Sequence, residues 1–263
     1  MVDLHCHILP GLDDGPRTLE ASLELARAAS DAGIDTVVAT PHIRDDHPFA
    51  IELIEERVGE LRLALRDAEI DIEVVSGGEV ALSKLVELDD ETLAKLCMGE
   101  GRYLLVESPY TQAPSLLETA LYDLQLRGFR PVLAHPERSS TFLSDRARLE
   151  DLAERDVLCS VTAMSLAGAF GKEISDFTLG LFRRGLVHNI ASDAHDTTRR
   201  PPGFARALAC LETELGGDTA SVRWFTDDAG RAIIEGRSLR GGPPLLDGRR
   251  FGWRRMKKRV GLA

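Results

Sequence analysis

The sequence predicts an α/β fold, a single-domain and distorted TIM-like (β/α)7 barrel. Seven short apolar runs alternate with stretches of helical period, and this alternation is typical of a parallel sheet covered by helices. The length of 263 residues is close to the ~250 residues of such a barrel. An open, doubly wound sheet is the competing architecture, and the length favours the barrel.

The predicted strands are short apolar runs, and the predicted helices repeat an apolar residue every three or four positions. In the third helix, Leu117, Leu121 and Leu124 lie on one face, and Gly128 follows as a residue that ends helices. The strands are expected at residues 2–5, 34–40, 72–80, 103–107, 130–135, 157–163 and 187–192. The helices are expected at residues 19–32, 51–68, 115–127, 145–155, 173–185 and 203–214.

Charge and cysteine usage restrict the class of protein. The net charge of −11 repels phosphate backbones, so we expect no nucleic-acid partner. The four cysteines are scattered without a CxxC pair, which is typical of reduced thiols. The chain shows neither an apolar run of the ~18–20 residues that span a bilayer nor a secretion signal. We therefore expect a cytoplasmic protein.

The end of the chain differs in composition from the rest. Residues 1–240 are predicted to form the barrel domain, and residues 241–263 a basic tail rich in arginine and lysine, with Phe251 and Trp253 among them. We favour a solvated terminus for this tail. The alternative is an amphipathic surface that gives peripheral contact with anionic lipid or with a partner.

Histidines and acids gather at the ends of the predicted strands. Parallel strands of a barrel all end at one mouth, which is where such enzymes keep their sites. We therefore expect nine side chains to converge there: His5, His7, Asp14, His42, Glu79, Glu107, His135, Asp193 and His195.

Such a cluster requires compensating charge, because neighbouring carboxylates repel and buried imidazoles need partners. Divalent cations supply it. His5 and His7 lie two residues apart, so a strand points both to one face, and Cys6 faces the wall. The mixed nitrogen and oxygen donors favour Mn²⁺, Fe²⁺ or Zn²⁺ over Mg²⁺ or Ca²⁺.

Six motifs together resemble the PHP (polymerase and histidinol phosphatase) superfamily. Within it, the sequence is most similar to the bacterial manganese-dependent tyrosine-protein phosphatases of capsule and exopolysaccharide operons. The resemblance covers about residues 1–240. The motifs are Asp-Leu-His-Cys-His at 3–7, Leu-Asp-Asp-Gly-Pro at 12–16, Thr-Pro-His at 40–42, Gly-Glu at 78–79, His-Pro-Glu-Arg at 135–138 and Ser-Asp-Ala-His at 192–195.

The resemblance implies a barrel that holds two or three Mn²⁺ ions, with Fe²⁺ or Zn²⁺ as alternatives. It implies that Asp14, His42 and His195 hold the third ion. His5, His7, Glu79, Glu107, His135 and Asp193 resemble the ligands of the other two. Arg138 and Arg200 resemble the arginines that contact phosphate, with Arg199 as the neighbouring alternative to Arg200. Asp13 is interpreted as a turn or cap residue, and His47 and His188 as structural or solvent-facing residues.

The implied activity is a metal-dependent protein-tyrosine phosphatase, a hydrolase that cleaves phosphotyrosine with a hydroxide bridging two metals. The implied substrate is a membrane-bound bacterial tyrosine autokinase that regulates capsular and exopolysaccharide biosynthesis. A histidinol-phosphate phosphatase is the alternative within the superfamily, and a non-catalytic regulator is the alternative outside enzymes. A cysteine phosphatase is excluded, because no cysteine is followed by arginine at the sixth position.

Overall fold

The computed structural model describes residues 1–108 and 114–239, so the predicted basic tail lies outside the described residues. Strand pairing in the described part is parallel throughout. The strands are β1 (Val2–Cys6), β2 (Thr36–Ala39), β3 (His42–Ile43), β4 (Glu73–Ser76), β5 (Glu79–Val80), β6 (Tyr103–Glu107), β7 (Arg130–Ala134), β8 (Leu158–Thr162) and β9 (Asn189–Ala191).

The strands form one ring built from two sheets, in the orders β1-β2-β4 and β3-β5-β6-β7-β8-β9. The predicted strand 72–80 is divided into β4 and β5 at two glycines. A Cβ on Gly77 would lie 2.9 Å from Val38, so side chains are excluded there. The ring closes where Cys6 bridges Ala194 and the His7 N–H donates to the Ala194 carbonyl at 2.9 Å. The predicted seven-unit barrel is thus confirmed. β2 with β3, and β4 with β5, each take one position in the ring, and the seven positions follow the order of the sequence.

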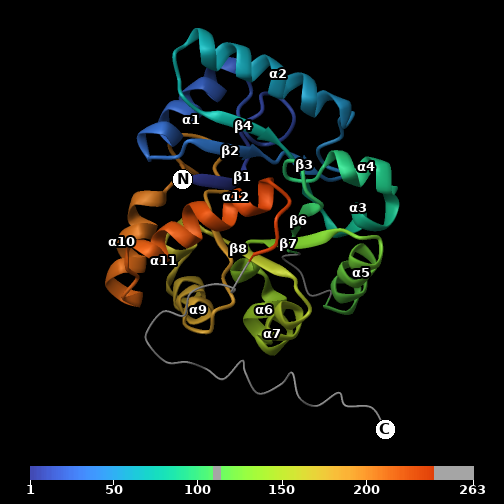
Figure 1. Cartoon of the computed structure of the whole chain (residues 1–263), viewed down its shortest axis with the longest axis vertical. Coiled ribbons are helices and arrows are strands. Elements are labelled where there is room, and N and C mark those ends of the chain that lie inside the picture. Colours follow the sequence, from blue (N-terminus) through green and yellow to red (C-terminus); the bar gives the residue numbers. More distant parts are fainter. Residues whose placement is uncertain (109–113, 240–263) are drawn as a thin grey trace.

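Helices surround the ring (Figure 1). Thr18 accepts a hydrogen bond from the Ala21 N–H and caps the first helix, which begins at residue 19 as predicted. The α-helices are α1 (Leu19–Asp31), α2 (Glu52–Asp67), α3 (Leu82–Glu87), α4 (Asp90–Lys95), α5 (Pro114–Leu126), α6 (Ser140–Ser144), α7 (Ala147–Glu154), α8 (Ala163–Leu166), α9 (Lys172–Arg183), α10 (Phe204–Leu215), α11 (Thr219–Arg223) and α12 (Ala229–Ile234). A 3₁₀ turn spans Pro136–Arg138, and a π-helix spans Trp224–Asp228.

The apolar core has two layers. One fills the inside of the ring with side chains such as Val38, Leu105 and Val132, together with Ile233 of α12, which closes the amino-terminal end. The larger layer lies between the ring and its helices. Because these apolar side chains fill the ring toward its amino-terminal end, the polar side chains gather at the carboxyl-terminal mouth. None of the helices in the described ranges combines the length and hydropathy needed to cross a membrane.

Candidate metal centre

The structure brings all nine predicted side chains together at the carboxyl-terminal mouth of the barrel. Eight of them are buried, and Asp14 is the exposed member. They form four overlapping groups, and within each group the donor atoms lie within 4.8 Å of one another. The groups are His7, Asp14, His42 and His195; His5, His7 and Asp193; His5, Glu79 and His135; and His42, Glu79 and Glu107. We call this cluster the pit.

A β-bulge in β1 aims the first two histidines into the pit. Asp3 pairs with Val37 and Cys6 with Ala39, so two residues of β1 lie between these pairs but only one residue of β2 does. The strand β1 therefore carries one extra residue. Leu4 therefore packs inside the ring, and the next residue, His5, also faces inward. Cys6 points to the outer apolar layer, as predicted. Bulges of this kind are common at barrel rims and next to active sites, where they re-aim side chains.

Glu79 is the centre of the pit. Its Oε1 lies 2.8 Å from His135 Nε2, and its Oε2 lies 2.8 Å from His42 Nδ1 and 3.3 Å from His5 Nε2. His5 Nε2 and His7 Nε2 are 3.1 Å apart, and each lies 3.4 Å from Asp193 Oδ1. Four buried imidazoles, two from β1 and β3 and two from the residues directly after β1 and β7, thus place ring nitrogens near the same two carboxylates.

The outer part of the pit is organised around Asp14. Its Oδ1 lies 3.0 Å from His195 Nε2 and 3.6 Å from His42 Nε2, and its side chain is 47% exposed. The other pit carboxylates are at most 8% exposed. Asp14 therefore marks the side on which the pit opens to solvent.

Two of the pit residues have left-handed backbone conformations. His135 has φ 37° and Asp193 has φ 54°, although neither is a glycine. Such conformations cost of order 1–3 kcal/mol and cluster at functional sites. Here they turn the chain directly after β7 and after β9, so that each side chain points inward at the end of its strand.

The charges in the pit are strongly coupled. Burial raises the pKa of Glu79, but the imidazoles around it, His5 foremost, hold that pKa well below its usual range. Burial raises the pKa of Glu107, and the nearby Glu79 raises it further. Burial lowers the pKa of His7, but Asp13 outweighs burial and raises it to about 10. A cation that binds His7 must therefore displace a proton from that ring.

The donor set fits divalent transition metals. Five imidazoles and four carboxylates meet in overlapping groups of three or four, which is the coordination that Mn²⁺, Fe²⁺ and Zn²⁺ accept. His5, His7, His42 and Glu79 each belong to two groups, and Glu79 has two carboxylate oxygens that can serve neighbouring ions. The ionic partners of Glu79 within the described residues are imidazoles, so bound cations are a natural source of further positive charge.

Two arginines flank the pit on one side. Arg138 and Arg200 both donate to Asp193 Oδ2, at 2.5 and 2.8 Å, and Arg200 also lies 3.6 Å from Asp14 Oδ2. The Arg138 guanidinium lies 5.1 Å over the Phe170 ring. Arg199 is exposed. The structure thus places Arg200, not Arg199, against the pit.

Two contacts were not predicted from the sequence. Asp13 does shape the turn, but it also lies 2.7 Å from His7 Nδ1. The sequence feature that could have indicated this contact is the position of Asp13 within the Asp-Asp-Gly-Pro motif. Arg44 donates to Glu107 at 2.9 Å, and nothing in its sequence context indicates this contact. His47 stacks on His42 with ring centroids 5.6 Å apart.

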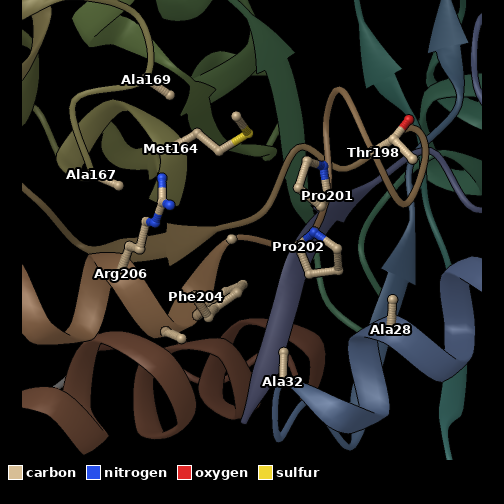
Figure 2. A pocket seen from close by; sticks show the side chains of 12 residues that line it. Ala28, Ala32, Met164, Ala167, Ala169, Thr198, Pro201, Pro202, Phe204 and Arg206 are labelled. Atoms are coloured by element: carbon tan, nitrogen blue, oxygen red, sulfur yellow. The ribbon is translucent and has the colours of Figure 1, made fainter.

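A separate groove of about 500 Å³ lies outside the pit and between helices (Figure 2). Met164, Phe204 and two prolines, Pro201 and Pro202, line it together with alanines of α1, and Arg206 is the charged residue in the lining. It shares none of the nine pit residues. Its apolar chemistry differs from that of the pit, which contains the ionisable groups.

Comparison with known proteins identifies relatives over nearly the whole chain. Residues 1–234 match the family model described as capsular polysaccharide synthesis, CpsB/CapC. Tyrosine-protein phosphatase YwqE of Bacillus subtilis (strain 168) is 38% identical over 222 residues, covering 83% of this chain and 86% of the relative. Tyrosine-protein phosphatase CpsB of Streptococcus pneumoniae is 27% identical over 246 residues, covering 89% and 99%.

Solved structures give the same result. A chain from the crystal structures of YwqE from Bacillus subtilis and CpsB from Streptococcus pneumoniae, described as metal-dependent tyrosine phosphatases, superposes with a TM-score of 0.84 at 33% identity. The match covers 95% of this chain and 100% of that one. Histidinol phosphate phosphatase from Lactococcus lactis superposes with a TM-score of 0.51 at 13% identity, covering 81% and 94%, which shows a shared fold.

Proposed function

We propose that this chain, which belongs to the capsular polysaccharide synthesis family CpsB/CapC, uses its pit to hydrolyse phosphotyrosine in proteins. It is a metal-dependent tyrosine-protein phosphatase. The observation that carries the proposal is the meeting of nine nitrogen and oxygen ligands in one pit with two arginines beside them.

The nine pit residues are the proposed metal ligands. His5, His7, Glu79, Glu107, His135 and Asp193 would hold two ions, and Asp14, His42 and His195 a third. Bound divalent ions supply positive charge for the phosphoryl oxygens and activate water at neutral pH. We assign Mn²⁺ as the metal, with Fe²⁺ or Zn²⁺ as alternatives that the same donors accept.

The two arginines are the proposed phosphate-binding residues. In the described structure both donate to Asp193, so their guanidinium groups already lie at the pit wall. An entering phosphate offers oxygens that suit the planar fork of arginine, and a guanidinium stays charged at any working pH. Arg138 is held by the Phe170 ring, so it is pre-oriented, whereas Arg200 comes from the loop after Asp193.

The leaving group explains why this pit suits phosphotyrosine. A tyrosyl group leaves as a phenolate with a pKa of about 10, which needs less help from a general acid than an aliphatic alkoxide. The pit opens at Asp14, so an exposed tyrosine on a protein surface can reach it. The histidinol phosphate alternative has an alkoxide leaving group and is supported by fold similarity alone.

The family also supports a substrate. We propose that the chain acts in the cytoplasm on a membrane-bound tyrosine autokinase of capsule or exopolysaccharide synthesis. The capsular family description and the four free cysteines support this placement.

The test compares phosphotyrosyl peptide and histidinol phosphate as substrates of the purified full-length chain. The metal is first removed with a chelator and then restored as Mn²⁺, Fe²⁺ or Zn²⁺. We expect no hydrolysis after chelation and hydrolysis of the phosphotyrosyl peptide after Mn²⁺ is added. Activity that persists in chelator, or that is confined to histidinol phosphate, would contradict the proposal.

A further inference from the structure

Asp13 connects three parts of the pit without belonging to any of its donor groups. Its Oδ2 lies 2.7 Å from His7 Nδ1 and accepts the backbone N–H of His42 at 2.9 Å. Its Oδ1 accepts the backbone N–H of Gly15 at 2.9 Å. The Asp13 side chain is 1% exposed. One buried carboxylate thus contacts the histidine directly after β1, the start of β3 and the loop that carries Asp14.

The contact with His7 decides which ring nitrogen faces the pit. With a metal ion at Nε2 the imidazole carries one proton, and the carboxylate next to Nδ1 keeps that proton on Nδ1. The lone pair of Nε2 then points toward His5, Glu79 and Asp193. His7 belongs to two of the four donor groups, so its tautomer affects both.

The pit histidines differ in how their second nitrogen is used. His195 Nδ1 lies 3.0 Å from the backbone carbonyl of Asp193, so the main chain orients that ring. Both nitrogens of His42 face carboxylates of the pit itself. His7 instead has a partner carboxylate outside the donor groups, an arrangement that commonly fixes the orientation of metal-binding histidines and raises their basicity.

The loop around Asp13 packs closely against the residue that follows β1. A Cβ on Gly15 would lie 2.3 Å from the His7 carbonyl oxygen, so the loop lies directly on β1. The same carboxylate that orients His7 therefore also places Asp14, the residue on which the outer donor group is centred.

We propose that Asp13 is a positioning residue that fixes the Nδ1-protonated form of His7 and holds the Asp14 loop against β1, and thereby sets the metal affinity of the pit. This inference rests on the proposed metal-dependent function and deepens it. Asp13 is not itself a ligand, and its effect is exerted through His7, His42 and Asp14.

The main test is the isosteric variant Asp13→Asn. The amide has one acceptor oxygen in place of two. If that oxygen accepts from Gly15, the NH₂ group faces His7 Nδ1, which must then accept, so the imidazole proton moves to Nε2, and the His42 N–H loses its acceptor. If the oxygen instead faces His7, the negative charge that favours a proton on Nδ1 is lost. Asp218→Asn is the matched control, because Asp218 is an exposed cap of α11 and asparagine caps helices about equally well.

Mn²⁺ binding to the metal-free full-length protein is measured by titration calorimetry, with circular dichroism as the check on folding. We expect the Kd of Asp13→Asn to rise ~10- to 100-fold, as for other partners of metal-bound histidines, and that of Asp218→Asn to stay unchanged. An Asp13→Asn Kd equal to that of the wild type overturns the role of Asp13 alone. A wild type that binds no Mn²⁺ overturns the proposed function as well.

A second measurement needs no variant. Nitrogen-15 NMR of histidine-labelled wild-type protein, loaded with diamagnetic Zn²⁺, reports which nitrogen of each imidazole carries the proton. We expect His7 to carry it on Nδ1. A proton on Nε2 of His7 would overturn the proposal even if Asp13→Asn fails to fold.

Discussion

His188 is a buried histidine outside the pit whose protonation should destabilise this protein. It lies just before β9, on the opposite side of the barrel from the pit, and its side chain is buried. Its ring Nδ1 accepts the backbone N–H of Cys159 at 3.1 Å, and the backbone N–H of His188 donates to the Cys159 carbonyl at 2.8 Å. It was interpreted from the sequence as structural or solvent-facing, and the structure shows it to be structural.

The size of the effect follows from the surroundings of the ring. Burial lowers the pKa of His188 to about 4, and a hydrogen bond to the backbone of Leu186 offsets this lowering only in part. The unfolded chain has a pKa near 6.5. The unfolded state therefore takes up a proton first, and the stability due to neutral His188 is complete above pH 6.5 and is lost as the pH falls toward 4. At ~1.4 kcal/mol per unit, the loss is ~2 kcal/mol at pH 5 and ~3 kcal/mol at pH 4.

The assay is urea unfolding of metal-free protein at several pH values between 7 and 5, for the wild type and for His188→Asn. Asparagine places an acceptor oxygen close to the position of Nδ1 but does not titrate. The pit residues titrate in both proteins, so their contribution is removed when the unfolding free energy of one protein is subtracted from that of the other. We expect this difference to shift against the wild type by ~2 kcal/mol between pH 7 and pH 5. A difference that is constant with pH would refute the reasoning.

Two further predictions concern the pit. His5→Ala should reduce phosphatase activity to background with the fold retained, because it removes a proposed ligand. Cys6→Ser should leave turnover largely intact, because Cys6 faces the outer core. If Cys6→Ser is inactive and chelators do not affect the wild-type activity, the metal assignment is contradicted. Arg138→Lys should lower kcat/KM by ~100-fold, since lysine lacks the planar fork that donates to Asp193 and phosphate, whereas Arg199→Lys at an exposed position should not. Equal losses in both arginine variants would argue against the assigned roles.

Much of the barrel was predictable because its strands and helices carry strong local patterns. The strand 103–107 and the helix beginning at Leu19 were predicted with the observed limits or nearly so. The division of 72–80 into β4 and β5 was not predicted, because the two glycines act through close packing against Val38 and Leu96, which lie elsewhere in the chain. The short helices between strands lack enough turns to show a period.

The convergence of the nine pit residues was predictable from topology, because a parallel barrel brings all strand ends to one mouth. The roles assigned to them stay predictions. The contacts of Asp13 and Arg44 were beyond sequence reasoning for different reasons. Asp13 looks like any turn aspartate until its distance to His7 is known, and Arg44 meets Glu107 only because β3 and β6 flank β5 in the ring.

The bulge in β1 shows how one residue converts a core strand into a site. Strict alternation from Val2 and Leu4, which fill the ring, would place the next inward side chain at Cys6 and point His5 and His7 into the outer layer. The extra residue between Asp3 and Cys6 shifts the alternation. The strand therefore packs Val2 and Leu4 inside the ring and places His5 and His7 in the pit at the carboxyl-terminal mouth. Spacing alone predicts that His5 and His7 share a face. The partner strand and the bulge decide that this face is the pit.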